Sequence, residues 1–180
     1  MAVDVGDRRS VAFTAYLNYS YVDATFESAL TLRSPSNPAQ DANGNIQVLP
    51  GDRLPGIPQH RVKAGLDYDI IPDWTVGGTF VYASSQFYRG DESNQNAQLP
   101  GYQVVGLHTS YRFWKKSEVF IKVQNVFDRR YATYGIYSDP TGVGAPGVPA
   151  DAASNDPSVD NRFQSPAAPR SVFGGVRITF

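Results

Sequence analysis

The stretch His60-Arg-Val-Lys-Ala-Gly-Leu-Asp-Tyr-Asp-Ile70 decides the fold class of this chain. Its apolar side chains occupy alternate positions, namely Val62, Ala64, Leu66, Tyr68 and Ile70. Four charged side chains and one glycine fill the positions between them, namely Arg61, Lys63, Gly65, Asp67 and Asp69. Side chains of a β-strand alternate between two faces, whereas a helix would scatter both sets around its axis. The stretch therefore predicts a strand with one apolar face and one polar face.

Five further segments show a similar alternation, at residues 11–26, 74–85, 102–113, 118–131 and 170–180. Each has about ten residues or slightly more, which matches the roughly 9–11 residues that a tilted strand needs to cross a bilayer. Strands of ordinary globular proteins are shorter, about 5–6 residues. The six segments therefore predict an all-β protein whose strands are long enough to span a membrane.

The links between these segments alternate in length. Residues 27–59 and 132–169 are long links rich in proline, and 86–101 is a link of medium length. Residues 71–73 and 114–117 are tight turns. Barrels of the outer membrane place long loops outside the cell and short turns in the periplasm. We therefore predict an antiparallel transmembrane β-barrel portion of about six strands, with long extracellular loops and short periplasmic turns.

Composition excludes several classes of function. The chain has 180 residues, with 16 Lys and Arg against 17 Asp and Glu, so it lacks the basic field that a nucleic-acid partner would need. Cysteine is absent and there are two histidines, which excludes thiol catalysis and disfavours a metal site. The sequence has no nucleophile elbow. We expect no enzyme activity, no catalytic residue, no metal and no cofactor.

The polar positions of the predicted strands carry the best functional candidates. We expect the following side chains to line the lumen of a barrel: Arg61, Lys63, Asp67, Asp69, His108, Arg112, Lys122 and Arg177. A charge that faces lipid costs about 2–4 kcal/mol at the bilayer midplane, and this cost alone explains the segregation. The acids Asp91 and Glu92 fall in the medium link, where we expect a solvated loop rather than an acid–base pair.

The C-terminus ends on Gly175-Val-Arg-Ile178-Thr-Phe180. A glycine, an apolar residue at the third-last position and a terminal aromatic resemble the signal that the barrel-assembly machine reads in outer-membrane proteins. We therefore assign Gly175, Ile178 and Phe180 to a barrel-assembly signal. Gly174 departs from the pattern, which prefers a polar residue there.

Four internal motifs resemble the C-terminal part of the barrel of TonB-dependent outer-membrane receptors. They are Leu54-Pro-Gly-Ile-Pro-Gln-His60-Arg, Tyr88-Arg-Gly-Asp91-Glu, Leu99-Pro-Gly-Tyr102-Gln-Val-Val and Gln124-Asn-Val-Phe-Asp128-Arg-Arg-Tyr131. Their order and spacing match the last six strands of that family, and Asn125-Val-Phe-Asp128 followed by Tyr131 is the most specific piece. In the family this piece lies on the penultimate strand.

The resemblance implies a receptor that takes up a scarce nutrient, most often a ferric siderophore, with energy delivered by TonB. It implies these partners: membrane lipid, the remaining barrel strands and the plug of a full-length receptor, TonB through the missing N-terminal part, the barrel-assembly machine, and a ferric siderophore or similar ligand. The sequence assigns no substrate-binding residue, because the binding surface is shared with parts that this chain lacks.

The family has a plug domain, a TonB-binding segment and a barrel of about twenty-two strands. We therefore expect residues 1–180 to be the C-terminal portion of a receptor barrel without its plug, with an unpaired strand edge. Two alternatives stay open, a small autonomous porin-like β-barrel and a soluble all-β binding module. A requirement for lipid or detergent separates the soluble module from the other two.

Overall fold

The computed structural model describes residues 12–114, 117–141 and 159–179. Phe180 of the predicted assembly signal and Lys115 and Lys116 of the second tight turn lie outside the described residues. The described ranges contain ten strands: β1 (Phe13–Tyr21), β2 (Leu30–Arg33), β3 (Asn45–Val48), β4 (His60–Ile71), β5 (Trp74–Ala83), β6 (Tyr102–Trp114), β7 (Ser117–Gln124), β8 (Ala132–Tyr137), β9 (Arg162–Pro166) and β10 (Ser171–Ile178). The same ranges hold no helix that is long and apolar enough to cross a membrane.

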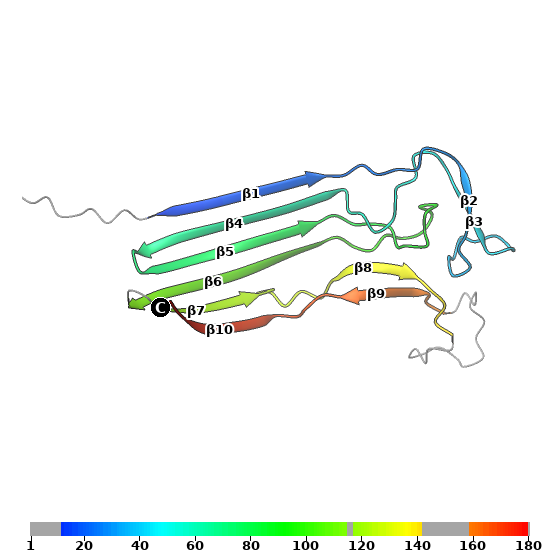
Figure 1. Ribbon diagram of the computed structural model, residues 1–180. Helices are drawn as coiled ribbons and strands as arrows, with labels where there is room; N and C mark the ends of the chain where they lie inside the picture. Colours follow the sequence, from blue (N-terminus) through cyan, green and yellow to red (C-terminus); the bar gives the residue numbers. More distant parts are fainter. Residues whose placement is uncertain (1–11, 115–116, 142–158, 180) are drawn as a thin grey trace, which may run out of the picture.

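Six strands form one antiparallel sheet in the order β1-β4-β5-β6-β7-β10. Figure 1 shows them side by side, with β1 at one edge and β10 at the other. Within the described residues each edge strand pairs with one neighbour only. These six strands correspond to the six predicted segments, so the predicted antiparallel all-β architecture is confirmed.

The links lie at two opposite ends of this sheet, as predicted (Figure 1). Residues 22–59, 84–101, 125–141 and 159–170 lie at one end, which we call the loop end. Strands β4 and β5 join through Pro72 and Asp73 at the other end, which we call the turn end, and β6 and β7 meet there as well. This arrangement follows from the antiparallel order of the strands.

One face of the sheet is apolar and covered by nothing in the described structure. Its large side chains are exposed, including Phe13, Leu17, Leu107 and Val172, the last two at 49% and 67%. A soluble sandwich would bury such a face against a second sheet. Burial is concentrated at the loop end instead, where Tyr88, Leu99, Ala132 and Tyr137 form a core cluster. An uncovered apolar face of this length is what a membrane-spanning wall requires.

The long links contain two small ribbons that the alternation of side chains does not predict. Strand β2 pairs with β3, and β8 pairs with β9. These strands have four to six residues, which is too short for a period-two pattern to stand out among prolines and glycines. In Figure 1 the β8–β9 ribbon continues the β7–β10 pair beyond the main sheet.

Strand β7 ends earlier than the predicted segment 118–131. It stops at Gln124, because Asn125 takes a left-handed φ of 51° that leaves the extended conformation. Asp128 has the same φ of 51°. Asparagine and aspartate tolerate this region better than most residues. The specific motif piece Asn125-Val-Phe-Asp128 is therefore a turn that follows the strand rather than a part of the strand.

Candidate functional site

The polar face of the main sheet carries all eight charged or histidine side chains singled out from the sequence. Register places Thr14, Asp67, Gly77, His108 and Lys122 in one row across β1, β4, β5, β6 and β7. Residues directly opposite one another share a face of the sheet. The remaining members lie on the same face by the period of two or by pairing: Arg61, Lys63, Asp69, Arg112 and Arg177.

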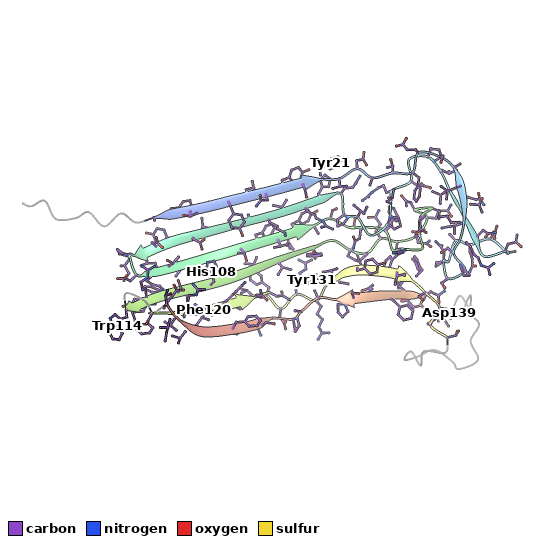
Figure 2. The ribbon with its side chains drawn as sticks, viewed as in Figure 1. Tyr21, His108, Trp114, Phe120, Tyr131 and Asp139 are labelled. Carbon is purple, nitrogen blue, oxygen red and sulfur yellow. The ribbon has the colours of Figure 1, made fainter. Side chains whose placement is uncertain are left out.

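The structure joins two of these side chains across an intervening strand. His108 Nε2 and Asp67 Oδ1 are 2.6 Å apart, although β5 runs between their strands. The contact passes over Gly77, and a Cβ at that position would collide with both side chains. Figure 2 shows His108 in the main sheet, away from both ends of β6. The missing side chain of Gly77 therefore makes the Asp67–His108 bond possible.

Other charges near the turn end are also paired. Arg177 lies 3.5 Å from Glu118 and its guanidinium lies 5.9 Å from the centre of the Phe120 ring. Arg112 lies 3.9 Å from Asp73, and the Thr75 hydroxyl donates to Asp69. In the described part of the chain, Arg61, Lys63 and Lys122 form no ion pair. Arg112 and Arg177 are thus paired with acids near the turn end, whereas the three unpaired cations lie in the middle of the sheet or toward its loop end.

The loop end is organised by Asp91, which is fully buried. Its carboxylate accepts hydrogen bonds from the Asn37 and Asn96 side-chain amides and from the backbone N–H groups of Gln95 and Asn96. The prediction of a solvated acid is therefore wrong for Asp91. A buried carboxylate is tolerated when amide donors replace its hydration, and here the donors come from two separate links.

The β8–β9 ribbon docks on the same cluster. The Tyr88 ring occupies the space beside Gly135, and the Gln164 side chain donates to the Tyr88 hydroxyl at 2.6 Å. The backbone of Arg89 exchanges hydrogen bonds with β8 at Gly135 and Tyr137. Burial, with the nearby charge of Asp91, raises the pKa of Tyr137 to about 12. Three links that are distant in sequence therefore pack as one body.

Two more of the motifs place a pair of tyrosines beside each other. Gly101 of the Leu99-Pro-Gly-Tyr102 motif approaches the backbone of Ala83 and Ser84 so closely that a Cβ would not fit. The side chain of Asn125 accepts from the Arg129 N–H at 2.9 Å and donates to the Arg129 and Ala168 carbonyls. This braced turn presents Tyr131, whose ring centre lies 4.4 Å from that of Tyr102.

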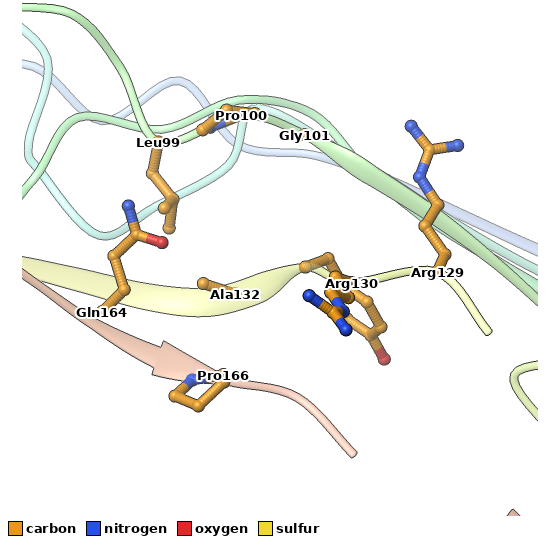
Figure 3. A pocket seen from close by; sticks show the side chains of 9 residues that line it. Leu99, Pro100, Gly101, Arg129, Arg130, Ala132, Gln164 and Pro166 are labelled. Atoms are coloured by element: carbon orange, nitrogen blue, oxygen red, sulfur yellow. The ribbon is translucent and has the colours of Figure 1, made fainter. Parts of the chain in front are cut away.

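Two hollows flank Tyr131. The outer hollow has a volume of about 370 Å³ and is lined by Leu99, Arg129, Arg130 and Gln164 as well as Tyr131. Figure 3 shows Leu99 and Gln164 directed toward one another across it, with Arg129 and Arg130 at one end.

The inner hollow, of about 260 Å³, lies on the polar face and is lined by Thr79, Tyr102, Lys122, Gln124 and Tyr131 among others. Figure 2 places Tyr131 where the main sheet meets the start of β8. Both tyrosines belong to motifs that stand out in the sequence, but their contact depends on a turn conformation that strand periodicity does not reveal.

Comparison with known proteins identifies the family. Residues 4–126, more than half of the 180, match the family described as "TonB dependent receptor-like, beta-barrel". The chain belongs to this family. Each of the four motifs of this TonB-dependent receptor chain contributes residues to the links at the loop end.

Curated relatives of this TonB-dependent receptor chain have the names of siderophore and metal receptors. The probable TonB-dependent siderophore receptor PiuA of Acinetobacter baumannii is 26% identical over 86 residues, covering 48% of this chain and 11% of PiuA. The ferric enterobactin receptor of Pseudomonas aeruginosa is 28% identical over 114 residues, covering 59% of this chain and 15% of the relative. The chain thus spans a small part of the length of these relatives.

Solved structures of TonB-dependent receptors share the fold. The closed form of the E. coli ferric-catecholate import receptor Fiu superposes with a TM-score of 0.62 at 18% identity, covering 94% of this chain and 19% of Fiu. The siderophore receptor PiuA from Acinetobacter baumannii superposes with a TM-score of 0.54 at 19% identity, covering 72% of this chain and 15% of PiuA. These matches confirm that the six-stranded sheet has the fold of a receptor barrel wall.

Proposed function

We propose that this chain forms part of the barrel wall of an outer-membrane receptor that imports a ferric siderophore with energy from TonB. The observation that carries the proposal is the pairing of an uncovered apolar face with a polar face that holds every charged side chain of the predicted lumen set. A receptor wall needs both faces, because one contacts lipid and the other contacts the plug and the passing ligand.

In this proposal the apolar face contacts membrane lipid and the polar face lines the lumen. Placing a lysine or arginine of the polar face in lipid would cost about 2–4 kcal/mol at the bilayer midplane. The open edges at β1 and β10 pair with the remaining strands of the receptor, because unpaired backbone groups are unfavourable in lipid. Gly175, Ile178 and Phe180 serve the barrel-assembly machine.

The loop end faces the outside of the cell and captures the ligand together with a plug, while TonB acts on the plug from the periplasm. The names of the relatives support a ferric siderophore as the ligand. The packed links around Asp91 support a receptor over an open porin, because they give the loop end a defined surface. The receptor carries the ligand without chemical change, so it is not an enzyme.

Spin labels test the assignment of faces in the receptor that contains this chain. Leu66→Cys and Asp67→Cys place labels on adjacent residues of β4 with opposite directions. We expect the label at residue 66 to report contact with lipid-soluble oxygen and the label at residue 67 to report contact with a water-soluble paramagnet. Equal accessibility of both labels in membranes, or solubility of the receptor without detergent, would contradict the proposal.

Uptake of iron tests the ligand. A strain that depends on this receptor for iron should grow on at least one ferric siderophore in a panel, and growth should require TonB. Growth on no ferric complex, with the receptor present in the outer membrane, would reject a ferric siderophore as the ligand.

A further inference from the structure

The inner hollow beside Tyr131 has the chemistry of a binding site for an anionic group with an aromatic face. We propose that Lys122, Tyr102 and Tyr131 form such a subsite on the wall of the receptor. This inference rests on the proposed function, since it names the kind of ligand that the receptor carries. It adds a residue-level site that the general function does not require.

Charge is the first argument. Lys122 lines the inner hollow, and Arg129 and Arg130 line the outer hollow on the other side of Tyr131. No aspartate or glutamate is among the described residues that line either hollow. These three cations form no ion pair in residues 12–114, 117–141 and 159–179. Positive groups that no acid neutralises attract an anion, and low-dielectric walls strengthen that attraction.

Acids in the row of Lys122, on β7 and in the turn after β7 are engaged elsewhere. Asp67 is bonded to His108 in the same row as Lys122, and Glu118 pairs with Arg177. Asp128 belongs to the same turn as Arg129, but its carboxylate accepts the Arg170 N–H. Arg112 and Arg177 near the turn end thus have acidic partners, whereas Lys122, Arg61 and Lys63 form no ion pair within the described residues.

The aromatic lining is the second argument. The rings of Tyr102 and Tyr131 lie 4.4 Å apart at an angle of 32° and both border the inner hollow. Burial raises the pKa of the Tyr131 phenol, so the ring borders the hollow without a charge. Offset and tilted aromatic contacts contribute beyond the area that they bury. An apolar or cationic ligand would leave Lys122 unmatched, and a small inorganic anion would leave the rings unused.

The shape of the site is held by elements that do not depend on a ligand. Asn125 braces the turn before Tyr131, and the Ala167 N–H bonds to the Tyr131 carbonyl at 2.9 Å. Tyr102 lies at the first position of β6, next to Gly101, which packs against the backbone after β5. A site on a braced turn and a strand end is preorganised, so binding loses little conformational freedom.

Three ferric complexes separate charge from aromaticity as probes. Ferric tris(catecholate) is anionic and aromatic, ferric citrate is anionic and not aromatic, and ferric tris(acetohydroxamate) is neutral and not aromatic. Binding of each to the purified receptor that contains this chain is measured by fluorescence quenching. We expect the aromatic anion to bind best. Lys122→Gln and Tyr131→Leu should each weaken it about five- to tenfold, while Tyr131→Phe should change it less than twofold.

Arg177→Gln provides the matched control, because it removes a positive charge from the same face at the turn end, away from the hollow. It should leave binding unchanged. Equal binding of the aromatic anion by Lys122→Gln, Tyr131→Leu and the unaltered receptor would overturn the subsite, and so would tighter binding of the neutral complex. If the subsite is overturned but a strain with the unaltered receptor still grows on a ferric siderophore, the proposed function stands. If that strain grows on no ferric siderophore, the proposed function itself is rejected.

Discussion

At the scale of single residues, glycines on the polar face determine which side chains can meet. Gly77 allows Asp67 and His108 to bond across β5, and the Tyr16 ring lies over Gly65 in the same way. The Phe120 ring lies over Gly175 at the other side of the sheet. In each case a large polar or aromatic side chain lies flat on the wall because its neighbour has no side chain. The polar face therefore stays low in profile at these glycines.

Replacing Gly77 by alanine should destabilise the receptor that contains this chain. The new Cβ would collide with Asp67 and His108, so their bond must open or the strands must shift, at a cost of about 1–3 kcal/mol. The effect is measured by heating samples to increasing temperatures and finding, on a gel, the temperature at which the band of the folded barrel is replaced by the band of the unfolded chain.

Gly78→Ala is the control, since the nearest atom to a Cβ there is Leu107 Cδ2 at 3.5 Å, an ordinary contact. If both variants melted at the same temperature, the account of Gly77 would be wrong.

At the scale of elements, the β8–β9 ribbon is the part whose position depends on side-chain packing. It is joined to the main sheet by chain connections and docks through Tyr88, Tyr137 and Gln164 on the cluster around Asp91. The main sheet is held by six continuous strands instead. We therefore expect the ribbon to detach under conditions that leave the sheet intact.

High pH should release the ribbon. The pKa of Tyr137 rises from an ordinary value of 10.0 to about 12 in the folded protein, so the fold favours the neutral phenol. This contribution is complete below pH 10, where both states hold the proton. It is lost as the pH rises from 10 to 12, since the unfolded state then gives up its proton more readily. In this window the protection factors of the β8 amides, which compare their hydrogen exchange with that of an unfolded peptide at the same pH, should fall. The protection factors of the β4 amides should stay high.

Tyr137→Phe removes the ionisable group and keeps the ring, so it should abolish the fall in the β8 protection factors between pH 10 and 12. An unchanged pH profile in this variant would show that another group controls the docking of the ribbon.

At the scale of the whole molecule, the antiparallel order fixes which segments share an end. The buried body around Asp91 and the two hollows lie at the loop end, and the tight connection through Pro72 and Asp73 lies at the turn end. Insertion in an outer membrane would therefore expose the two ends to different compartments. Our proposal places the loop end outside the cell.

Single cysteines should report this orientation cleanly, because the chain has no cysteine of its own. In the receptor on intact cells, a maleimide that cannot cross membranes should label Asp139→Cys, an exposed loop-end position (Figure 2). It should label Asp73→Cys at the turn end only after the outer membrane is permeabilised. Labelling of Asp73→Cys on intact cells, with Asp139→Cys protected, would invert the proposed topology.

The alternation of side chains in residues 60–70 and in five other segments determined the six long strands and the division of their faces. This was readable from the sequence because alternation is a local property with a period of two residues. The order of long links and tight turns followed from the same segments. The motifs marked the residues of the loop end without revealing what they do there.

Only the tertiary structure decided the contacts between residues that are far apart along the chain. Asp67 and His108 are 41 positions apart, and Asn37 and Asp91 are 54 positions apart. Register, the left-handed turn at Asn125 and the space beside each glycine bring such residues together. A local pattern contains no information about these distances, so it predicted a solvated loop where the fold buries a carboxylate. The Tyr102–Tyr131 pair and the inner hollow arise in the same way.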